Sequence, residues 1–168
     1  MSILGKKWLI KNNNETKSIF ERVAENRNFE ENQELKDFHD PFLFNEMEKV
    51  VARINKAIKE QERIVVFGDY DVDGISGTAL LVHALRKFGA NVSFRLPNRA
   101  TDGYGFSMKF VDEFIEKKIN LVITVDCGIS CSREITKAHE HGIDTIVTDH
   151  HTIPEVLTES IFAVLHPK

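Results

Sequence analysis

The sequence contains few cysteines and no long uncharged apolar segment. Its two cysteines, Cys127 and Cys131, are four positions apart, a spacing that is neither CxxC nor half of a recognised zinc motif. Two reduced thiols are therefore favoured over a zinc site. No stretch reaches the ~18 uncharged apolar residues of a membrane span, and the N-terminus lacks the apolar core of a signal peptide. These absences predict a cytoplasmic protein without a membrane segment.

The chain also lacks an excess of basic residues. Its formal net charge is −4 and its pI is near 6.0, whereas nucleic-acid binding is usually accompanied by a basic surface. The acidity does not exclude a phosphate-containing ligand, because two divalent cations bound by aspartates would make the site locally positive. The aspartates considered for this role are Asp69, Asp71, Asp73, Asp126 and Asp149.

The composition is that of a globular protein with one sizeable core. Hydrophobic residues make up 42% and charged residues 29% of the 168 positions. Residues 1–40 are polar and rich in Asn and Glu, so we expect a peripheral N-terminal arm with a helix over 15–26. Residues 41–168 form the main domain, which opens with an amphipathic helical pattern over 47–58.

Strand and helix patterns alternate after Arg63. We expect strands at about 64–67, 91–96, 121–125, 143–148 and 161–165. The helices between them are expected at about 76–88, 107–118 and 131–141. Such alternation predicts an α/β fold with a doubly wound, mainly parallel five-stranded sheet flanked by helices.

The stretch "GDYDVDG" at 68–74 has aspartates at alternating positions and resembles the start of an EF-hand calcium loop. Two observations contradict a calcium loop. The position of the bidentate glutamate is occupied by Leu80, and the preceding "RIVVF" is typical of a strand rather than a helix. A catalytic metal site and a solvated acidic turn both remain open for this stretch taken alone.

Acidic and imidazole side chains follow three of the expected strands. Asp69, Asp71 and Asp73 follow the first strand, Asp126 the third, and Asp149, His150 and His151 the fourth. The carboxyl ends of parallel strands share one edge, where open α/β sheets bind ligands. Carboxylates and imidazoles without thiolates suit Mn²⁺ or Mg²⁺, and a two-metal site suits phosphoester hydrolysis.

Each of these residues also has a purely structural interpretation. Asp126 would serve as an N-cap for the following helix, and the two histidines would be solvent-exposed polar side chains. Their joint placement on one edge favours the metal site.

Arg95 and Arg99 lie in a glycine-bearing loop after the second strand, which is either a plain turn or a phosphate-binding loop. His83 is expected in the core, and His166 has no evident local partner.

Four ordered motifs resemble those of the DHH phosphoesterases. They are "VVFGDYDVDGISGTALL", "LPNRATDGYG", "ITVDCGIS" and "TDHH". The sequences of these motifs are most similar to those of the family's bacterial exonucleases specific for single-stranded DNA. The resemblance covers about residues 37–168 and includes "FHDPFLFNEMEKVVARINKAI" before the first motif. It implies a metal-dependent hydrolase with two Mn²⁺ or Mg²⁺ ions and single-stranded DNA as its partner.

The resemblance also implies roles for individual residues. Asp71 and Asp73 would bind the two metals, and Asp126 would bridge them. His150 would be a metal ligand, and His151 would lie beside the scissile phosphate with Asp149 orienting the histidines. Other DHH branches have a histidine ligand before the aspartate pair; none precedes it closely here, and Asp69 is the candidate for that role.

The resemblance is partial in one respect. The family has a further metal-binding aspartate downstream of the DHH motif, and its exonucleases carry two more domains that resemble nothing in this chain. We therefore expect an incomplete, monomeric fragment of a 5′–3′ exonuclease for recombination and repair. The alternatives are a phosphodiesterase of dinucleotides or short oligonucleotides, and a non-catalytic DHH-like module that binds a protein partner.

Overall fold

The structure is a computed structural model that describes residues 16–26, 39–103 and 105–168. It divides into two compact units, Met1–Asp40 and Pro41–Lys168. In the first unit the described residues form helix α1, Ile19–Asn26. Ser18 Oγ accepts a hydrogen bond from the Glu21 amide, and Glu21 Oε2 accepts one from the Ser18 amide, at 3.2 and 2.7 Å. This reciprocal capping explains why the helix starts at Ile19.

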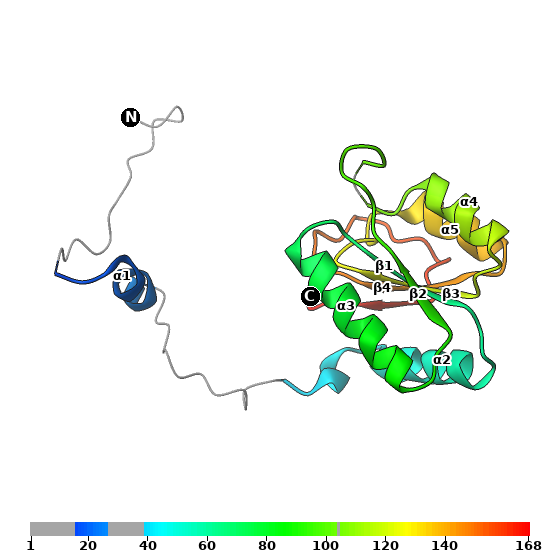
Figure 1. Cartoon of the computed structure of the whole chain (residues 1–168), viewed down its shortest axis with the longest axis horizontal. Coiled ribbons are helices and arrows are strands. Elements are labelled where there is room, and N and C mark those ends of the chain that lie inside the picture. Colours follow the sequence, from blue (N-terminus) through cyan, green and yellow to red (C-terminus); the bar gives the residue numbers. More distant parts are fainter. Residues whose placement is uncertain (1–15, 27–38, 104) are drawn as a thin grey trace. The chain divides into compact units, whose positions relative to one another are not determined.

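The second unit alternates strands and helices in the order that the sequence predicts (Figure 1). Its elements are the short 3-10 helix η1 (Pro41–Leu43), α2 (Met47–Lys59), β1 (Ile64–Gly68), α3 (Val72–Lys87), β2 (Val92–Arg95), α4 (Met108–Glu116), β3 (Leu121–Val125), α5 (Ser132–Glu140), β4 (Asp144–Thr148) and β5 (Ala163–Leu165). Gly89 and Gly142 follow α3 and α5 with φ of +79° and +76°, the left-handed conformation that ends many helices.

The five strands form one parallel sheet in the order β2-β1-β3-β4-β5. The predicted doubly wound parallel sheet is therefore confirmed. The chain leaves β1 toward β2 on one side and then returns to β3 on the other side. The carboxyl ends of β1 and β3 consequently flank the topological switch point, where sheets of this order bind ligands.

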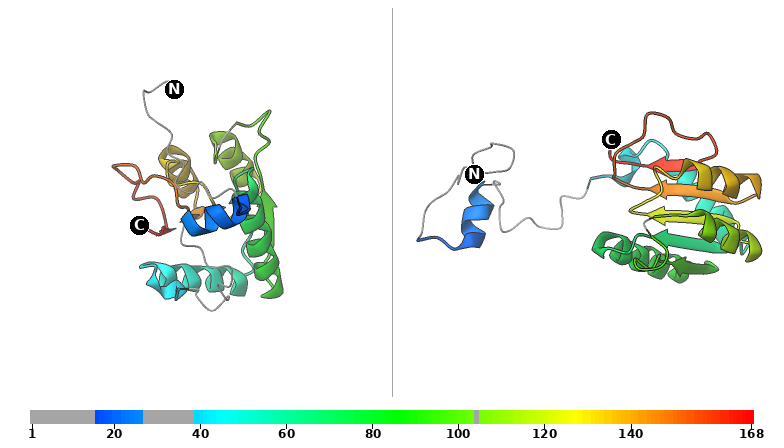
Figure 2. Two further views of the ribbon diagram at one scale, coloured as in Figure 1. Left: turned by 90° about the vertical axis from the view of Figure 1, so that its left-hand side faces the viewer. Right: turned by 90° about the horizontal axis from the view of Figure 1, so that it is seen from above.

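Helices cover both faces of the sheet. Figures 1 and 2 show α2 and α3 on one face and α4 and α5 on the other. Alternate residues of β1 supply the two cores: Ile64 and Val66 pack with residues of α2 and α3, while Val65 and Phe67 pack with residues of α4 and α5. A strand buried on both faces explains the continuous apolar run "IVVF".

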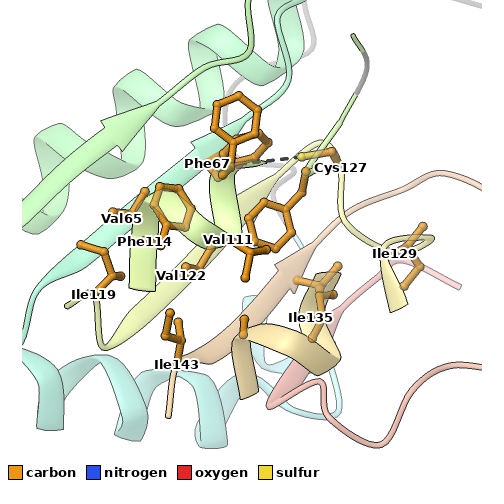
Figure 3. Packing of buried hydrophobic residues seen from close by; sticks show 14 residues of the cluster. Val65, Phe67, Val111, Phe114, Ile119, Val122, Cys127, Ile129, Ile135 and Ile143 are labelled. Atoms are coloured by element: carbon orange, nitrogen blue, oxygen red, sulfur yellow. Dashed lines mark hydrogen bonds between the residues drawn. The ribbon is translucent and has the colours of Figure 1, made fainter. Parts of the chain in front are cut away.

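Phe67 is the centre of an aromatic cluster at the end of β1 (Figure 3). Its ring centroid lies 5.2 Å from that of Phe106, 5.0 Å from that of Phe110 and 6.4 Å from that of Phe114. The Cys127 thiol lies 3.8 Å from the Phe67 carbonyl oxygen and connects the ends of β1 and β3. This packing holds the end of β1 in place immediately before the acidic stretch.

Two local predictions need correction. Helix α3 begins at Val72 instead of residue 76, because Asp71 caps it and the glycine at position 74 lets its first turn approach the strand. His83 is exposed rather than part of the core, because α3 packs against the sheet through Thr78, Val82 and Leu85.

Cys127 and Cys131 are free thiols, as predicted. Among the described residues, no helix combines the length and apolarity that crossing a membrane requires.

Candidate metal centre

The junction of β1 and α3 positions the first two aspartates. Asp69 follows the strand directly and is 2% exposed. Asp71 is the N-cap of α3, and its Oδ1 accepts a hydrogen bond of 3.0 Å from the Gly74 amide. A Cβ atom on Gly74 would lie 2.5 Å from the backbone nitrogen and oxygen of Asp69. Only glycine therefore lets the first turn of α3 lie this close to the end of β1.

The end of β3 positions Asp126. Its amide donates a 2.9 Å hydrogen bond to the Thr148 carbonyl, so the backbone remains tied to β4 one residue beyond the strand. Its φ is +60°, which is uncommon for a residue other than glycine and costs of order 1 kcal/mol or more. This conformation places Asp126 Oδ1 2.8 Å from His150 Nε2. The strained backbone thus brings together side chains that follow two different strands.

The end of β4 positions Asp149 and the two histidines. The side chain of Asp149 is almost completely buried and accepts four hydrogen bonds within the site. Oδ1 accepts from the amides of His150 and His151, at 2.7 and 3.0 Å, and lies 2.7 Å from His151 Nδ1. Oδ2 accepts from the Ile129 amide at 3.0 Å. Asp149 therefore organises the loop, and both of its oxygens are already hydrogen-bonded within it.

Two overlapping groups of possible metal ligands result from this arrangement. One ligand atom from each of Asp69, Asp71 and Asp126 lies within 4.8 Å of the others. The same limit holds for Asp126, His150 and His151. Asp126 belongs to both groups, which is the position expected of a carboxylate that bridges two ions.

Asp71 and Asp126 are electrostatically coupled. Burial and the neighbouring Asp71 carboxylate raise the pKa of Asp126, while its hydrogen bond with His150 acts in the opposite direction. The hydrogen bond from the Gly74 amide lowers the pKa of Asp71 and outweighs the opposing effect of burial. Two close carboxylates whose pKa values diverge resist simultaneous ionisation unless a cation lies beside them. The site is therefore electrostatically suited to a divalent cation.

Asp149 and His151 form a hydrogen-bonded pair beside this centre. Burial alone would raise the pKa of Asp149, but hydrogen bonds from His151, Ile129 and His150 outweigh it and lower the pKa. The hydrogen bond to Asp149 raises the pKa of His151. This partnership holds the His151 ring by Nδ1, so Nε2 is the nitrogen that can face a substrate.

The donor set fits Mn²⁺ or Mg²⁺. Asp69 Oδ1 is buried and has no hydrogen-bond partner, an arrangement that a ligated cation would compensate. The remaining donors are carboxylate oxygens and imidazole nitrogens, which these cations accept. The nearby Cys127 is a poor competitor as a ligand, because its thiol points to the Phe67 carbonyl and burial raises its pKa.

The structure does not bring all the predicted site residues together. Asp73 lies exposed in the first turn of α3 and belongs to neither ligand group. Arg95 forms an ion pair of 3.3 Å with Glu113 and lies over the ring of Phe110, so its guanidinium is directed to α4. Arg99 lies over the ring of Tyr70, with 5.3 Å between guanidinium carbon and ring centroid. Arg99 is thus close to the acidic stretch, and Arg95 is engaged elsewhere.

Two contacts were missed by sequence reasoning. Tyr70 supports Arg99, although the spacing of 29 residues between them carries no local signal. The prediction for His166 concerned local partners only and did not foresee a distant one: its Nε2 lies 2.8 Å from the carbonyl oxygen of His151, 15 residues away. Both contacts depend on how distant segments meet at the edge of the sheet.

A parallel sheet with aspartates and histidines at its switch point defines a doubly wound α/β protein with a candidate divalent-metal centre. The family description "DHH family, N-terminal domain" matches residues 63–168, which is more than half of the chain. The chain belongs to the DHH family.

The chain is also similar to exonucleases of this family. It is 41% identical over 132 residues to the single-stranded-DNA-specific exonuclease RecJ of Bacillus subtilis, covering 79% of this chain and 17% of that protein. A crystal structure of exonuclease RecJ bound to manganese matches with a TM-score of 0.66 and 41% identity, over 71% of this chain and 30% of that one. RecJ of Thermus thermophilus in complex with Mn²⁺ matches with a TM-score of 0.67 and 33% identity, over 86% and 20% of the respective chains.

These matches concern a small part of the relatives. The chain spans between 16% and 25% of the length of the curated RecJ relatives that it matches. The similarity therefore establishes the family and the fold of this region.

Proposed function

We propose that the gene product carrying this chain is a metal-dependent phosphodiesterase that acts as a 5′–3′ exonuclease on single-stranded DNA. The observation that carries the proposal is the pair of ligand groups joined at Asp126, in a chain similar to RecJ. Shared carboxylates are characteristic of two-metal sites that hydrolyse phosphodiesters. The family supplies the reaction class, and the similarity to RecJ supplies the substrate.

Five side chains are proposed as metal ligands. They are Asp69, Asp71, Asp73, Asp126 and His150, with Asp126 shared between two Mn²⁺ or Mg²⁺ ions. Bound there, the ions would lower the pKa of a water molecule and neutralise charge at the phosphate. Asp73 is the least supported member, because its carboxylate would have to turn from the exposed face of α3 toward the group.

His151 and Asp149 are proposed as the catalytic pair. Asp149 holds the proton on His151 Nδ1, and Nε2–H of the protonated ring then donates a hydrogen bond to an oxygen of the scissile phosphate. A ring held in one orientation interacts more effectively with a developing charge than a freely rotating ring. The short contacts of Asp149 within the loop support this division of roles.

Arg99 is proposed to bind a substrate phosphate, with Arg95 in a secondary role. The guanidinium of Arg99 stacks on Tyr70, which leaves its N–H groups able to form two parallel hydrogen bonds with a phosphate. Arg95 is paired with Glu113, so it would contact the DNA backbone through the guanidinium nitrogens that this ion pair leaves free. The single strand would be oriented by contacts on both sides of this loop.

The cellular setting follows from the proposed substrate. Single-stranded DNA arises inside the cell during recombination and repair, and we propose that the protein acts there, in the cytoplasm, as a monomer. The free thiols Cys127 and Cys131 are consistent with a reducing compartment.

The proposal is tested with the full-length gene product and a 5′-phosphorylated, 3′-labelled single strand in the presence of Mn²⁺. We expect stepwise release of mononucleotides from the 5′ end, and a loss of at least about 1000-fold for Asp126→Ala. The matched control is Asp112→Ala, because Asp112 lies on α4 and forms an ion pair with Lys137 on α5. Normal activity of Asp126→Ala would contradict the assignment of the site.

The products distinguish the alternative functions. An enzyme specific for dinucleotides or short oligonucleotides would cleave those substrates and leave a long strand intact. A non-catalytic module would cleave neither substrate at any Mn²⁺ concentration, and either result would overturn the exonuclease proposal.

A further inference from the structure

The segment after β5 contacts the loop that carries the two histidines. His166 follows the last residue of β5 directly. Its Nε2 lies 2.8 Å from the carbonyl oxygen of His151, and its Nδ1 lies 3.2 Å from the Lys168 amide nitrogen. One residue earlier, the Leu165 carbonyl accepts a 3.2 Å hydrogen bond from the Asp149 amide. Two successive residues therefore hold the loop from the side of β5.

The partners of His166 define its tautomer. The Lys168 amide can only donate a hydrogen bond, so Nδ1 of His166 must be the nitrogen with the free lone pair. The proton then lies on Nε2. The His151 carbonyl can only accept, so Nε2–H donates to it. Both contacts are satisfied together by the neutral imidazole with its proton on Nε2.

We propose that His166 is a positioning residue for the histidine loop. It fixes the carbonyl end of His151, while Asp149 fixes the amide and the ring of the same residue. His151 is then held from both sides of its Cα atom, and its ring can take one orientation. The role rests on the proposed function, since it matters for activity only if His151 contacts the substrate.

The chain offers variants that separate the hydrogen bond from the space the ring fills. His166→Phe keeps a ring of similar size but removes both nitrogens. His166→Gln places an amide N–H near the position of Nε2 and can still donate to the His151 carbonyl. His139→Phe is the matched control, because His139 is exposed on α5.

Amide hydrogen exchange in the metal-free chain is the first measurement. The amides of His150 and His151 donate to Asp149, so they report directly on opening of the loop. We expect them to exchange about fivefold faster in His166→Phe and within about twofold of wild type in His166→Gln. Amides of β1 and β3 should keep their exchange rates, because His166 acts on the loop alone. A general loss of stability would instead accelerate exchange throughout the sheet.

Binding of Mn²⁺, measured by calorimetry, is the second readout. We expect about fivefold weaker binding for His166→Phe and near-normal binding for His166→Gln and His139→Phe. Failure of wild type to bind Mn²⁺ would contradict the proposed metal centre, and the exchange rates would still decide the role of His166. Unchanged loop exchange in His166→Phe would overturn the positioning role.

The wild-type protein provides a test that needs no substitution. Nitrogen-15 NMR of the imidazoles distinguishes the two neutral tautomers. A proton on Nε2 of His166 is expected, and a proton on Nδ1 would overturn the proposal even if the variants fail to fold.

Discussion

At the scale of single residues, Asp126 has two features that oppose folding. Its backbone is in the left-handed region, and its carboxylate is buried beside that of Asp71, which raises its pKa. A raised carboxyl pKa means that the ionised form is disfavoured in the folded state, so at neutral pH the charge lowers stability. Strain and like charge in one residue are typical of a functional position.

Asp126→Asn should therefore stabilise the metal-free protein. Asparagine tolerates a positive φ and removes the negative charge, so we expect a gain on the order of 1 kcal/mol in the free energy of unfolding at pH 7. The same change should weaken Mn²⁺ binding by at least about 100-fold, since a shared ligand is lost. Urea denaturation and calorimetry measure the two effects, with Asp112→Asn as control. A variant less stable than wild type would contradict the electrostatic argument.

Asp149 should contribute stability that depends on pH. Its folded-state pKa is lowered, so its ionised form stabilises the fold above the ordinary carboxyl pKa of about 3.9. This contribution is lost as the pH falls through the lowered pKa. We expect Asp149→Asn to cost about 2 kcal/mol at pH 7 and to flatten the loss of stability below about pH 4.

The measurement is urea unfolding of the metal-free protein between pH 3 and pH 7. If the two proteins lose stability in parallel over this range, Asp149 is not the group responsible.

The sequence predicts the core of the site better than its surroundings. Asp69, Asp126 and Asp149 follow buried strands directly, so parallel pairing places all three at the same edge of the sheet. The position of Asp73 depends on where α3 begins, and the cap at Asp71 moves that start toward the strand. The contact of His166 with the His151 carbonyl depends on the register of β5. In so short a strand, the pattern of apolar and polar side chains does not define the register.

At the scale of secondary-structure elements, the junction of β1 and α3 depends on one glycine. A methyl group at Gly74 would lie 2.5 Å from backbone atoms of Asp69, which cannot rotate away. Gly74→Ala should therefore displace the first turn of α3 and lower the free energy of unfolding by about 2 to 3 kcal/mol. It should also weaken Mn²⁺ binding, because Asp69 and Asp71 move.

Ser76→Ala is the control for Gly74→Ala, since Ser76 is exposed in the same helix. Thermal unfolding and calorimetry give the two readouts. Equal stability of Gly74→Ala and Ser76→Ala would show that the helix start adapts without strain.

Helix α2 is held at the opposite edge of the sheet by a buried ion-pair network. Arg53, which is 8% exposed, lies 2.6 Å from Asp144 and 2.7 Å from Glu62. Removing the arginine leaves two partly buried carboxylates without a partner, so Arg53→Met should cost about 2 kcal/mol of unfolding free energy. Mn²⁺ affinity should stay within about twofold, because the network is at the amino ends of the strands.

Lys56→Met on the exposed face of α2 is the matched control, and urea denaturation is the measurement. A large loss of Mn²⁺ affinity in Arg53→Met would indicate that the two edges of the sheet are coupled, contrary to this account.

At the scale of the whole molecule, the strand order explains the place of the site. The alternation of strands and helices predicts parallel pairing, but it does not define which strands are neighbours. The observed order puts β1 beside β3 and β3 beside β4, so the residues that follow these three strands lie at one edge. An order that separated β1 from β3 would have divided the same aspartates between two distant places.

The most direct test of the metal centre is anomalous scattering from crystals of the chain soaked in Mn²⁺. We expect a manganese peak in contact with the Asp126 carboxylate, with Asp69, Asp71 or His150 completing the ligands. Crystals of Asp126→Asn should show no peak at that position. Absence of the peak in wild type at saturating Mn²⁺, or a peak that shares no ligand with Asp126, would contradict the central claim.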